Sequence, residues 1–398
     1  MDVAAMGGPK GEDGPSLQRL LTIHMLYSFI VAALIVLVPL YLLEQKVDVA
    51  MIGLILSVGP LSFMVLRVLF ASMADEIGTK AIATVHSASN LAAILLYLLV
   101  VSPVGFALAT LSEGIRASGF WAISRAEVFE ALGEEEPRKT LARFSNMRQL
   151  ADGLGRLAIG LSLAILAFQG AFAFMLALSI ALFALVLTNK EKSAGTMRVD
   201  RNTLGRIFKE RPPTFWHAAL LQLLVWLPYN MLSGFLLPLY MISDLGMTSY
   251  DVAIVLALLS IATAAFALLF MRIGLRKRSL LALTLLSAPA LALFPFAGTA
   301  GLVLLIVLAI GTGCTNIIGE YILVDQVYRS RDVNTDIGVI YAPLKIAEFI
   351  FLSTGGFVIA NYGFSPLFAV LAISLALFVV FARAVMTHNG HGIHKAKS

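Results

Sequence analysis

Long apolar segments alternate with short polar loops along almost the whole chain. An α-helix needs about 20 apolar residues to cross a hydrocarbon layer of ~30 Å, and twelve segments reach that length. We therefore predict an all-α integral membrane protein with twelve transmembrane helices. The predicted spans cover residues 20–43, 50–74, 82–102, 104–131, 141–168, 170–188, 215–242, 250–272, 279–299, 301–328, 336–360 and 364–387.

The composition supports a membrane protein and excludes several other classes. Of the 398 residues, 59% are hydrophobic and 13% are charged, against roughly 45–50% and about 25% in soluble domains. No polar block is long enough for a soluble domain, and no metalloprotease helix, nucleophile elbow or phosphate-binding glycine loop is present. We expect no enzyme, no cofactor, no metal site and no nucleic-acid partner. The single cysteine, Cys314, lies in an apolar segment and is expected to be a packing residue.

Basic residues in the loops predict the orientation of the chain. When the N-terminus is placed in the cytoplasm, the loops on the opposite side contain a single Lys or Arg, Lys46. Cytoplasmic loops of membrane proteins are enriched in Lys and Arg. We therefore expect a multi-pass protein of the cell membrane, in contact with the lipid bilayer, with both termini cytoplasmic. The N-terminal segment 1–17 is expected to be a short tail rather than a signal peptide, because the apolar segment after it is too long.

The two halves of the chain share short matching sequences. Pro-Leu-Tyr ends the first predicted span at Tyr41 and the seventh at Tyr240, and Asp-Val-Ala follows at Asp48 and Asp251. Such matches between apolar sequences can arise by chance, but here they occur in the same order at corresponding points. They predict a parallel repeat of six helices. The expected units are an N-terminal six-helix bundle (1–189), a central cytoplasmic loop (190–213) and a C-terminal six-helix bundle (214–398).

The loop after the second span carries a recognisable motif. Residues 71–80, Ala-Ser-Met-Ala-Asp-Glu-Ile-Gly-Thr-Lys, resemble the signature G-x-x-x-D-R-x-G-R-R of the major facilitator superfamily. Asp75, Gly78 and Lys80 match the signature, and residues 272–277 resemble it in the second half, with Met271 in place of its Asp. The positions that depart from the signature are Ala71, Glu76 and Thr79. The resemblance implies a secondary transporter that works by alternating access. It also implies that spans one, four, seven and ten line a cavity, with spans three, six, nine and twelve outside them.

Charged residues inside the spans are distributed as such a cavity would require. A charge at the centre of a span costs about 2.5–3.5 kcal/mol on insertion scales, so it should face protein or water. The cores of spans three, six, nine and twelve contain none. The charges concentrate in spans four, five, ten and eleven: Glu113, Arg116, Arg125, Glu127, Glu130, Arg148, Asp152, Arg156, Glu320, Asp325, Lys345 and Glu348.

Charges near the cytoplasmic helix ends are expected to form a gate. Ion pairs among them would hold the cytoplasmic side of the cavity closed, while the glycine allows the tight turn between two helices. The predicted gate comprises Asp75, Gly78, Lys80, Arg125, Glu127 and Asp325.

Deeper charges are the candidate substrate and coupling residues. Arg148, Asp152 and Arg156 recur every four residues and form one stripe, and Lys345 with Glu348 repeats the basic-then-acidic order in the second half. One interpretation is purely structural, because Glu113–Arg116, Arg148–Asp152 and Lys345–Glu348 have the spacing of helical ion pairs. The other is that Arg156 and Lys345, with Arg116, bind an anionic or polar substrate. Glu113, Asp152, Glu320 or Glu348 would then carry a coupled proton, since burial favours a neutral carboxyl group.

Uncharged residues complete the candidate lining. Tyr27 and His24 on the first span, and Gln222 and Asn230 on the seventh, offer hydrogen bonds or stacking to a solute. For His24 a structural role is the alternative to a proton-carrying one.

The candidate functions follow from these residues. Drug–proton antiporters of the superfamily carry a Gly-Pro pair on the fifth span, and here Arg156 follows Gly155 instead. We therefore favour a monomeric, proton-coupled transporter of a small hydrophilic metabolite, with organic anions among the candidates. The alternatives are a proton-coupled multidrug exporter and a non-transporting membrane sensor with the same fold.

Overall fold

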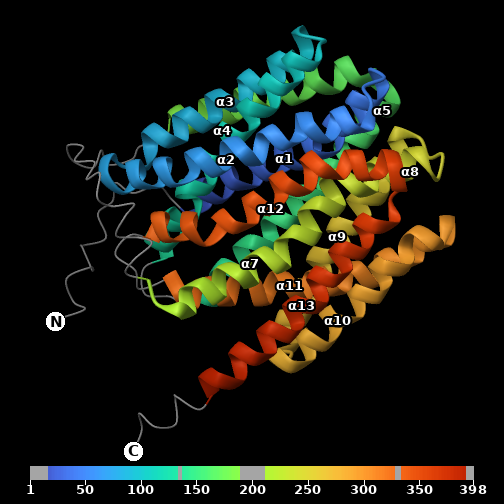
Figure 1. Ribbon diagram of the computed structural model, residues 1–398. Coiled ribbons are helices and arrows are strands. Elements are labelled where there is room, and N and C mark those ends of the chain that lie inside the picture. Colours follow the sequence, from blue (N-terminus) through green and yellow to red (C-terminus); the bar gives the residue numbers. More distant parts are fainter. Residues whose placement is uncertain (1–16, 133–136, 189–210, 328–332, 391–398) are drawn as a thin grey trace, which may run out of the picture.

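The computed structural model describes residues 17–132, 137–188, 211–327 and 333–390, and in these ranges the chain is helical apart from short turns (Figure 1). The helices are α1 (Leu17–Glu44), α2 (Val49–Ile77), α3 (Thr79–Leu99), α4 (Pro103–Leu132), α5 (Pro137–Leu187), α7 (Pro213–Met231), η2 (Leu232–Leu236), α8 (Leu237–Ser243), α9 (Ser249–Ile273), α10 (Lys277–Leu293), η3 (Phe294–Phe296), η4 (Gly298–Val303), α11 (Leu304–Val327), α12 (Val333–Tyr362) and α13 (Ser365–Gly390). The all-α fold is confirmed, and every predicted span falls on one of these segments.

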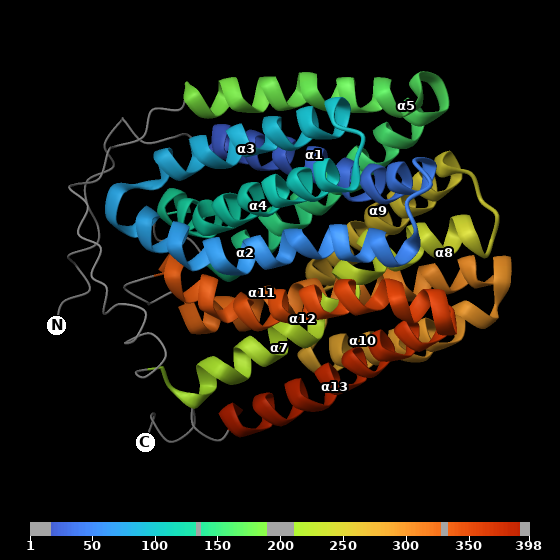
Figure 2. The ribbon, with the colours of Figure 1, turned by 45° about the horizontal axis from the view of Figure 1, so that its top comes forward.

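Ten of the described helical segments are long and apolar enough to cross a membrane. One of them, 44 residues long, lies in α5, whose 51 residues would extend about 77 Å if straight, more than twice a hydrocarbon layer. The chain reverses direction within α5 at Ala167, where φ is 54° and ψ is −173° (Figure 2). The fifth and sixth predicted spans are therefore the two arms of α5.

The fourth predicted span corresponds to α4, which is not among those ten segments. It is 30 residues long, but Glu113, Arg116 and further charges make it the most polar of the long helices beside the cavity described below. The count of twelve spans thus depends on α4 being held in the membrane by its protein neighbours.

The helices form two groups, α1–α5 and α7–α13, which we call the N-half and the C-half (Figures 1 and 2). Within the N-half, α1 packs on α5, and α4 packs on α2 and α3; within the C-half, α12 and α13 pack on α7, and α10 on α11 and α13. The halves meet along two seams, α2 against α12 and α5 against α9. The expected division at the central loop is compatible with this arrangement, and residues 189–210 of that loop lie outside the described residues.

Glycine permits the close approach at the first seam. A Cβ at Gly356 would lie 2.5 Å from the carbonyl oxygen of Val49, and one at Gly53 would lie 2.5 Å from that of Leu352. Backbone therefore packs directly on backbone where α2 begins and α12 nears its end. A side chain at either position would separate the two helices.

Corresponding loops of the two halves share a glycine turn. Gly78, between α2 and α3, has φ of 90° and donates its N–H to the Ala74 carbonyl. Gly274, which ends α9, has φ of 70° and donates to Phe270 and Met271. A positive φ is easily adopted only by glycine. These are the positions at which the two copies of the loop motif were recognised.

The seventh predicted span is interrupted. Five residues, Leu232–Leu236, form a π-helical turn between α7 and α8. Pro238 follows the turn and has no N–H to donate to the Gly234 carbonyl, so the regular hydrogen-bond pattern is broken at this point.

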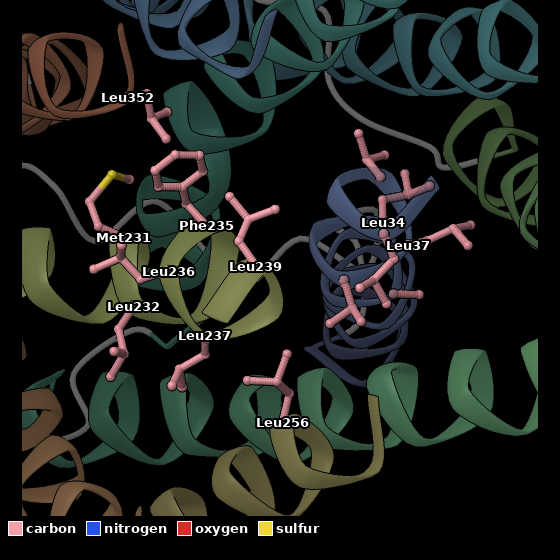
Figure 3. Packing of buried hydrophobic residues seen from close by; sticks show 14 of the residues in the cluster. Leu34, Leu37, Met231, Leu232, Phe235, Leu236, Leu237, Leu239, Leu256 and Leu352 are labelled. Atoms are coloured by element: carbon pink, nitrogen blue, oxygen red, sulfur yellow. The ribbon is translucent and has the colours of Figure 1, made fainter. Parts of the chain in front are cut away.

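The turn lies at the end of the bundle where α1 ends, which we call the Glu44 end; the opposite end is the Leu17 end. At the Glu44 end, Leu34 and Leu37 of α1 and Leu237 and Leu239 of α8 are fully buried in one apolar cluster that includes residues of both halves (Figure 3).

The α2–α12 seam supplies a direct test. Gly356→Ala should lower stability by about 1–3 kcal/mol, because the added methyl group overpacks backbone atoms that cannot move aside separately. The matched control is Gly338→Ala on the same helix, where the nearest atom to the new Cβ is 3.7 Å away. Thermal unfolding of the purified variants measures the difference. Equal unfolding temperatures for the two variants would contradict the tight backbone contact.

Candidate functional site

A cavity of about 330 Å³ lies between the two halves. Its lining comes from α1, α2, α4 and the first arm of α5 on one side, and from α7, η2, α11 and α12 on the other. Among the described residues, none from α3, the second arm of α5, α10 or α13 lines it. These are the spans that the family resemblance puts outside the cavity, and α2, α5 and α12 join the expected lining helices.

The cavity collects the deep charges of both halves. Its lining contains five basic and four acidic side chains, so one positive charge is in surplus. They are Arg67, Arg116, Arg148, Arg156, Lys345, Glu113, Asp152, Glu320 and Glu348. Eight of the nine are the predicted substrate and coupling residues; their roles remain predictions, but the structure brings all eight to one cavity.

Arg116 is held within the N-half. Its Nη2 contacts Glu113 Oε2 at 3.5 Å, and its Nη1 donates to Asn90 Oδ1 at 3.1 Å. Asn90 in turn donates to the Ser179 hydroxyl at 2.7 Å, which ties α4 to α3 and to the second arm of α5. Two of the three guanidinium nitrogens of Arg116 are therefore engaged in helix packing, as the structural interpretation of this pair expects.

Arg148 also contacts N-half residues. Its Nε donates to the Ser28 hydroxyl at 3.1 Å, and its guanidinium carbon lies 4.3 Å from the centre of the Trp121 ring. A guanidinium over an aromatic face is stabilised by the ring quadrupole. Arg148 therefore has both hydrogen-bonding and cation–π contacts.

Arg156 differs from these two arginines. Its side chain is only 2% exposed and lines the cavity, yet no oxygen in the described ranges accepts a hydrogen bond from its Nε or Nη1. Asp152 interacts with it electrostatically, but no Arg156–carboxylate contact within 4.0 Å occurs among the described residues. Buried guanidinium donors are costly to leave unsatisfied. Arg156 therefore has two buried donors available to an oxygen-bearing ligand.

The C-half contributes one compact charged group. Lys345 Nζ lies 2.6 Å from Glu348 Oε2, and Asn230 Nδ2 donates to Glu348 Oε1 at 2.6 Å. The Lys345 ammonium also lies 4.8 Å from the centre of the Phe63 ring on α2. Both carboxylate oxygens are thus occupied, and the group faces the N-half through Phe63.

Three polar contacts cross between the halves close to the cavity. Gln149 Nε2 donates to the Tyr229 hydroxyl at 2.6 Å, and the Ser145 hydroxyl donates to Glu320 Oε1 at 3.4 Å. The third joins Asn146 Nδ2 to the sulfur of Met271 at 3.1 Å. All three begin on α5, so this helix carries both the charged stripe and the polar contacts to the other half.

Two predicted lining residues lie elsewhere. His24 is outside the cavity, between the rings of Phe120 and Phe144, and its Nε2 lies 3.3 Å from Glu127 Oε2. Gln222 is fully buried, donates to the Gly319 carbonyl and accepts from the indole N–H of Trp226, both at 2.7 Å. Gln222 therefore orients Trp226, which does line the cavity. Tyr27 and Asn230 line the cavity as predicted.

Two residues of the predicted gate, Lys80 and Glu127, lie close together at the Leu17 end. Glu127 and Lys80 border a small pocket with His24 and His86. Gly78 makes the turn before α3, and Asp325 is exposed on α11. The side chains of Asp75 and Arg125 lie outside the described residues, so the structure does not test the ion-pair latch between the halves.

The structure adds lining residues to the predicted set. Arg67 is a lone arginine in the middle of an apolar span, which by itself indicates a functional position. Gln149 and Tyr229 lie three residues from Asp152 and Trp226, so helical spacing places them on the same faces. Trp121 gave no comparable signal, because aromatic residues are common at many depths in a membrane helix.

Comparison with known proteins identifies the family. The family model for the Major Facilitator Superfamily matches residues 20–272 and 218–397, which together cover nearly the whole chain. The chain belongs to this superfamily and is a multi-pass membrane transporter of the secondary type. A solved structure described as "Crystal structure of D-xylose-proton symporter" aligns with a TM-score of 0.67 at 11% identity, covering 92% of this chain and 97% of that one. At this identity the likeness concerns the fold alone. No curated protein sequence matches the chain.

The Lys345–Glu348 pair yields a stability prediction. Glu348→Gln should destabilise the protein, because it leaves the Lys345 ammonium without its carboxylate. Breaking a buried pair costs roughly 3–5 kcal/mol, and the 18% exposure of the Lys345 side chain puts the loss at or below the low end of that range. Adding Lys345→Met should recover much of the loss, since the double variant buries no unpaired charge. The single and double variants are compared by thermal unfolding. A double variant less stable than Glu348→Gln would contradict the pairing.

Proposed function

We propose that this protein is a proton-coupled secondary transporter of a small organic anion, which binds in the central cavity with Arg156 as its principal ligand. The observation that carries the proposal is the buried pair of Arg156 nitrogens that have no acceptor among the described residues. A carboxylate pairs with a guanidinium along one edge, so it can accept from Nε or from Nη1 through one oxygen while its second oxygen meets Nη2. The surplus positive charge of the lining also favours a monoanion over a neutral solute or a cation.

The coupling role falls to the acidic residues of the same cavity. Asp152 lies within the electrostatic reach of both Arg148 and Arg156, so an anion arriving at Arg156 competes with this carboxylate for positive charge. Protonation of Asp152 would remove its negative charge from the neighbourhood of Arg156 and so strengthen the attraction of Arg156 for the anion, which couples binding of the proton to binding of the anion. Glu348 takes a comparable place beside Lys345 in the other half.

The direction of the helices in the membrane is part of the proposal. Both termini lie in the cytoplasm of a cell-membrane protein, so the Glu44 end faces outward. Apolar packing of α1 in one cluster with α8 at that end supports a cavity that is closed to the outside in this conformation.

Anion binding is the first test. Small carboxylates should raise the unfolding temperature of the purified protein, because a ligand that binds only the folded state stabilises it. Arg156→Gln should weaken binding by roughly 10- to 100-fold, the effect of losing hydrogen bonds from a charged donor. Arg276→Gln, which removes the same charge from an exposed position beside α10, is the matched control. Stabilisation by lipophilic cations that persists in Arg156→Gln would favour the multidrug exporter instead.

Coupling is tested in liposomes. An imposed proton gradient should drive accumulation of the anion by the wild type, whereas Asp152→Asn should bind the anion and exchange it without responding to the gradient. Gradient-driven accumulation that is unchanged in both Asp152→Asn and Glu348→Gln would contradict the coupling role of these carboxylates. The absence of any solute movement would favour the non-transporting sensor.

A further inference from the structure

The cavity is divided along its length into a charged part and an apolar part. On α1 the lining begins with Tyr27 and Ser28 and continues only with apolar side chains toward Glu44. On α2, which passes in the opposite direction, apolar residues come first and Arg67 comes last. We call the uncharged part the apolar chamber. Val31, Leu34, Ile35, Val38, Leu56 and Leu352 line it, together with Thr110 and Ser233, whose hydroxyl groups donate to carbonyls of their own helices.

Close contacts fix the relative depth of the two parts. A Cβ at Gly155 would clash with the backbone of Phe29, so Arg156 lies near the level of Phe29 on α1. Val31, Leu34, Ile35 and Val38 follow Phe29 along the helix, at about 1.5 Å per residue, and therefore lie beyond Arg156 toward the Glu44 end. On the C-half, Leu352 lies one turn beyond Glu348 in the same direction.

The apolar chamber is closed beyond its lining. Leu37 of α1 and Leu237 and Leu239 of α8 are fully buried in the surrounding cluster (Figure 3). Gly234 of η2 lies close to α1, since a Cβ there would be 3.5 Å from a methyl carbon of Ile35. A solute held at Arg156 must therefore place whatever extends toward the Glu44 end against a lining that is mainly apolar.

We infer that the substrate is an amphipathic monoanion, with its carboxylate on Arg156 and an apolar chain or ring in the apolar chamber. This inference rests on the proposed function and specifies its substrate. Each methylene group moved from water into the chamber should tighten binding about fourfold. A polyhydroxylated anion of the same length binds poorly, because the hydroxyls of Thr110 and Ser233 already donate to carbonyls of their own helices and leave few partners for additional hydroxyl groups. A cavity of about 330 Å³ is at the small end of ligand sites, which limits the apolar part to a short chain or a single ring.

The test compares ligands of graded length on the full-length protein. Dissociation constants for acetate, butanoate, hexanoate, gluconate and hexylamine come from the concentration dependence of the unfolding temperature. Hexanoate should bind roughly 16-fold more tightly than butanoate, and gluconate and hexylamine should produce no shift. Arg156→Gln should lose the response to every carboxylate.

Variants of equal shape locate the apolar chamber. Val31→Thr combined with Val38→Thr keeps the volume of the two side chains but adds hydroxyl groups. The dissociation constants of the carboxylates should then depend less on chain length. Val65→Thr combined with Val104→Thr makes the same change at positions 62% and 71% exposed on the outer surface, and should keep the wild-type dependence. The surface pair also controls for partitioning of longer chains into detergent.

Each contrary result has a distinct meaning. Equal binding of acetate, gluconate and hexanoate, all lost in Arg156→Gln, would overturn the amphipathic inference and leave the proposed function standing. A length dependence unchanged in the Val31/Val38 variant would also overturn it. Binding of hexylamine as tight as that of hexanoate, and retained in Arg156→Gln, would overturn the proposed function. No shift with any carboxylate would overturn both.

Discussion

Nine charged side chains must be kept away from hydrocarbon in this protein, and the arrangement of its helices follows from that requirement. A charge facing lipid is costly, and a buried charge without a partner is costlier still. The chain meets both conditions by directing every one of these groups into one cavity between its halves. Glu113 and Glu348 neutralise neighbours three residues away, and Ser145 and Gln149 carry hydrogen bonds to the opposite half. Among the described residues, this arrangement leaves Nε and Nη1 of Arg156 without an acceptor.

The same requirement explains why some helices are polar and others are not. α4 is too charged to qualify as a membrane span by composition, yet it lies between α2 and α3 and presents its charges to the cavity. The helices that contribute nothing to the lining, α10 and α13 among them, expose large apolar side chains such as Leu286 and Val380. The deep charged residues are therefore found on helices that line the cavity, whereas the apolar surface is shared by lining and outer helices.

The fold was predictable from the sequence because membrane helices are specified by length and hydropathy, both of which are local properties. The predicted spans agree with the helices to within a few residues. The boundary that the residue repeat predicts between the halves stays a prediction. The set of deep charges was predictable for a related reason: in a bilayer, only a protein-facing or water-facing position tolerates them.

Side-chain direction was not predictable in the same way. His24 and Gln222 lie on the right helices, but His24 is turned between two aromatic rings and Gln222 is bonded to the Gly319 carbonyl. Those partners come from helices distant in the sequence, so no local pattern encodes them. The reversal at Ala167, by contrast, falls where the fifth and sixth predicted spans meet, and the π-helical turn at Leu232–Leu236 precedes Pro238, so both have a local origin in the sequence.

The two seams also restrict how the halves can move. α2 with α12 and α5 with α9 lie on opposite sides of the cavity, so two lines of contact flank it. Rotation of one half about an axis that passes through both seams widens the cavity at one end and narrows it at the other. With that axis fixed, the two ends of the cavity cannot be open at the same time. The backbone contact at Gly53 and Gly356 lies at the Glu44 end, so α2 and α12 would have to separate there before the cavity could open at that end.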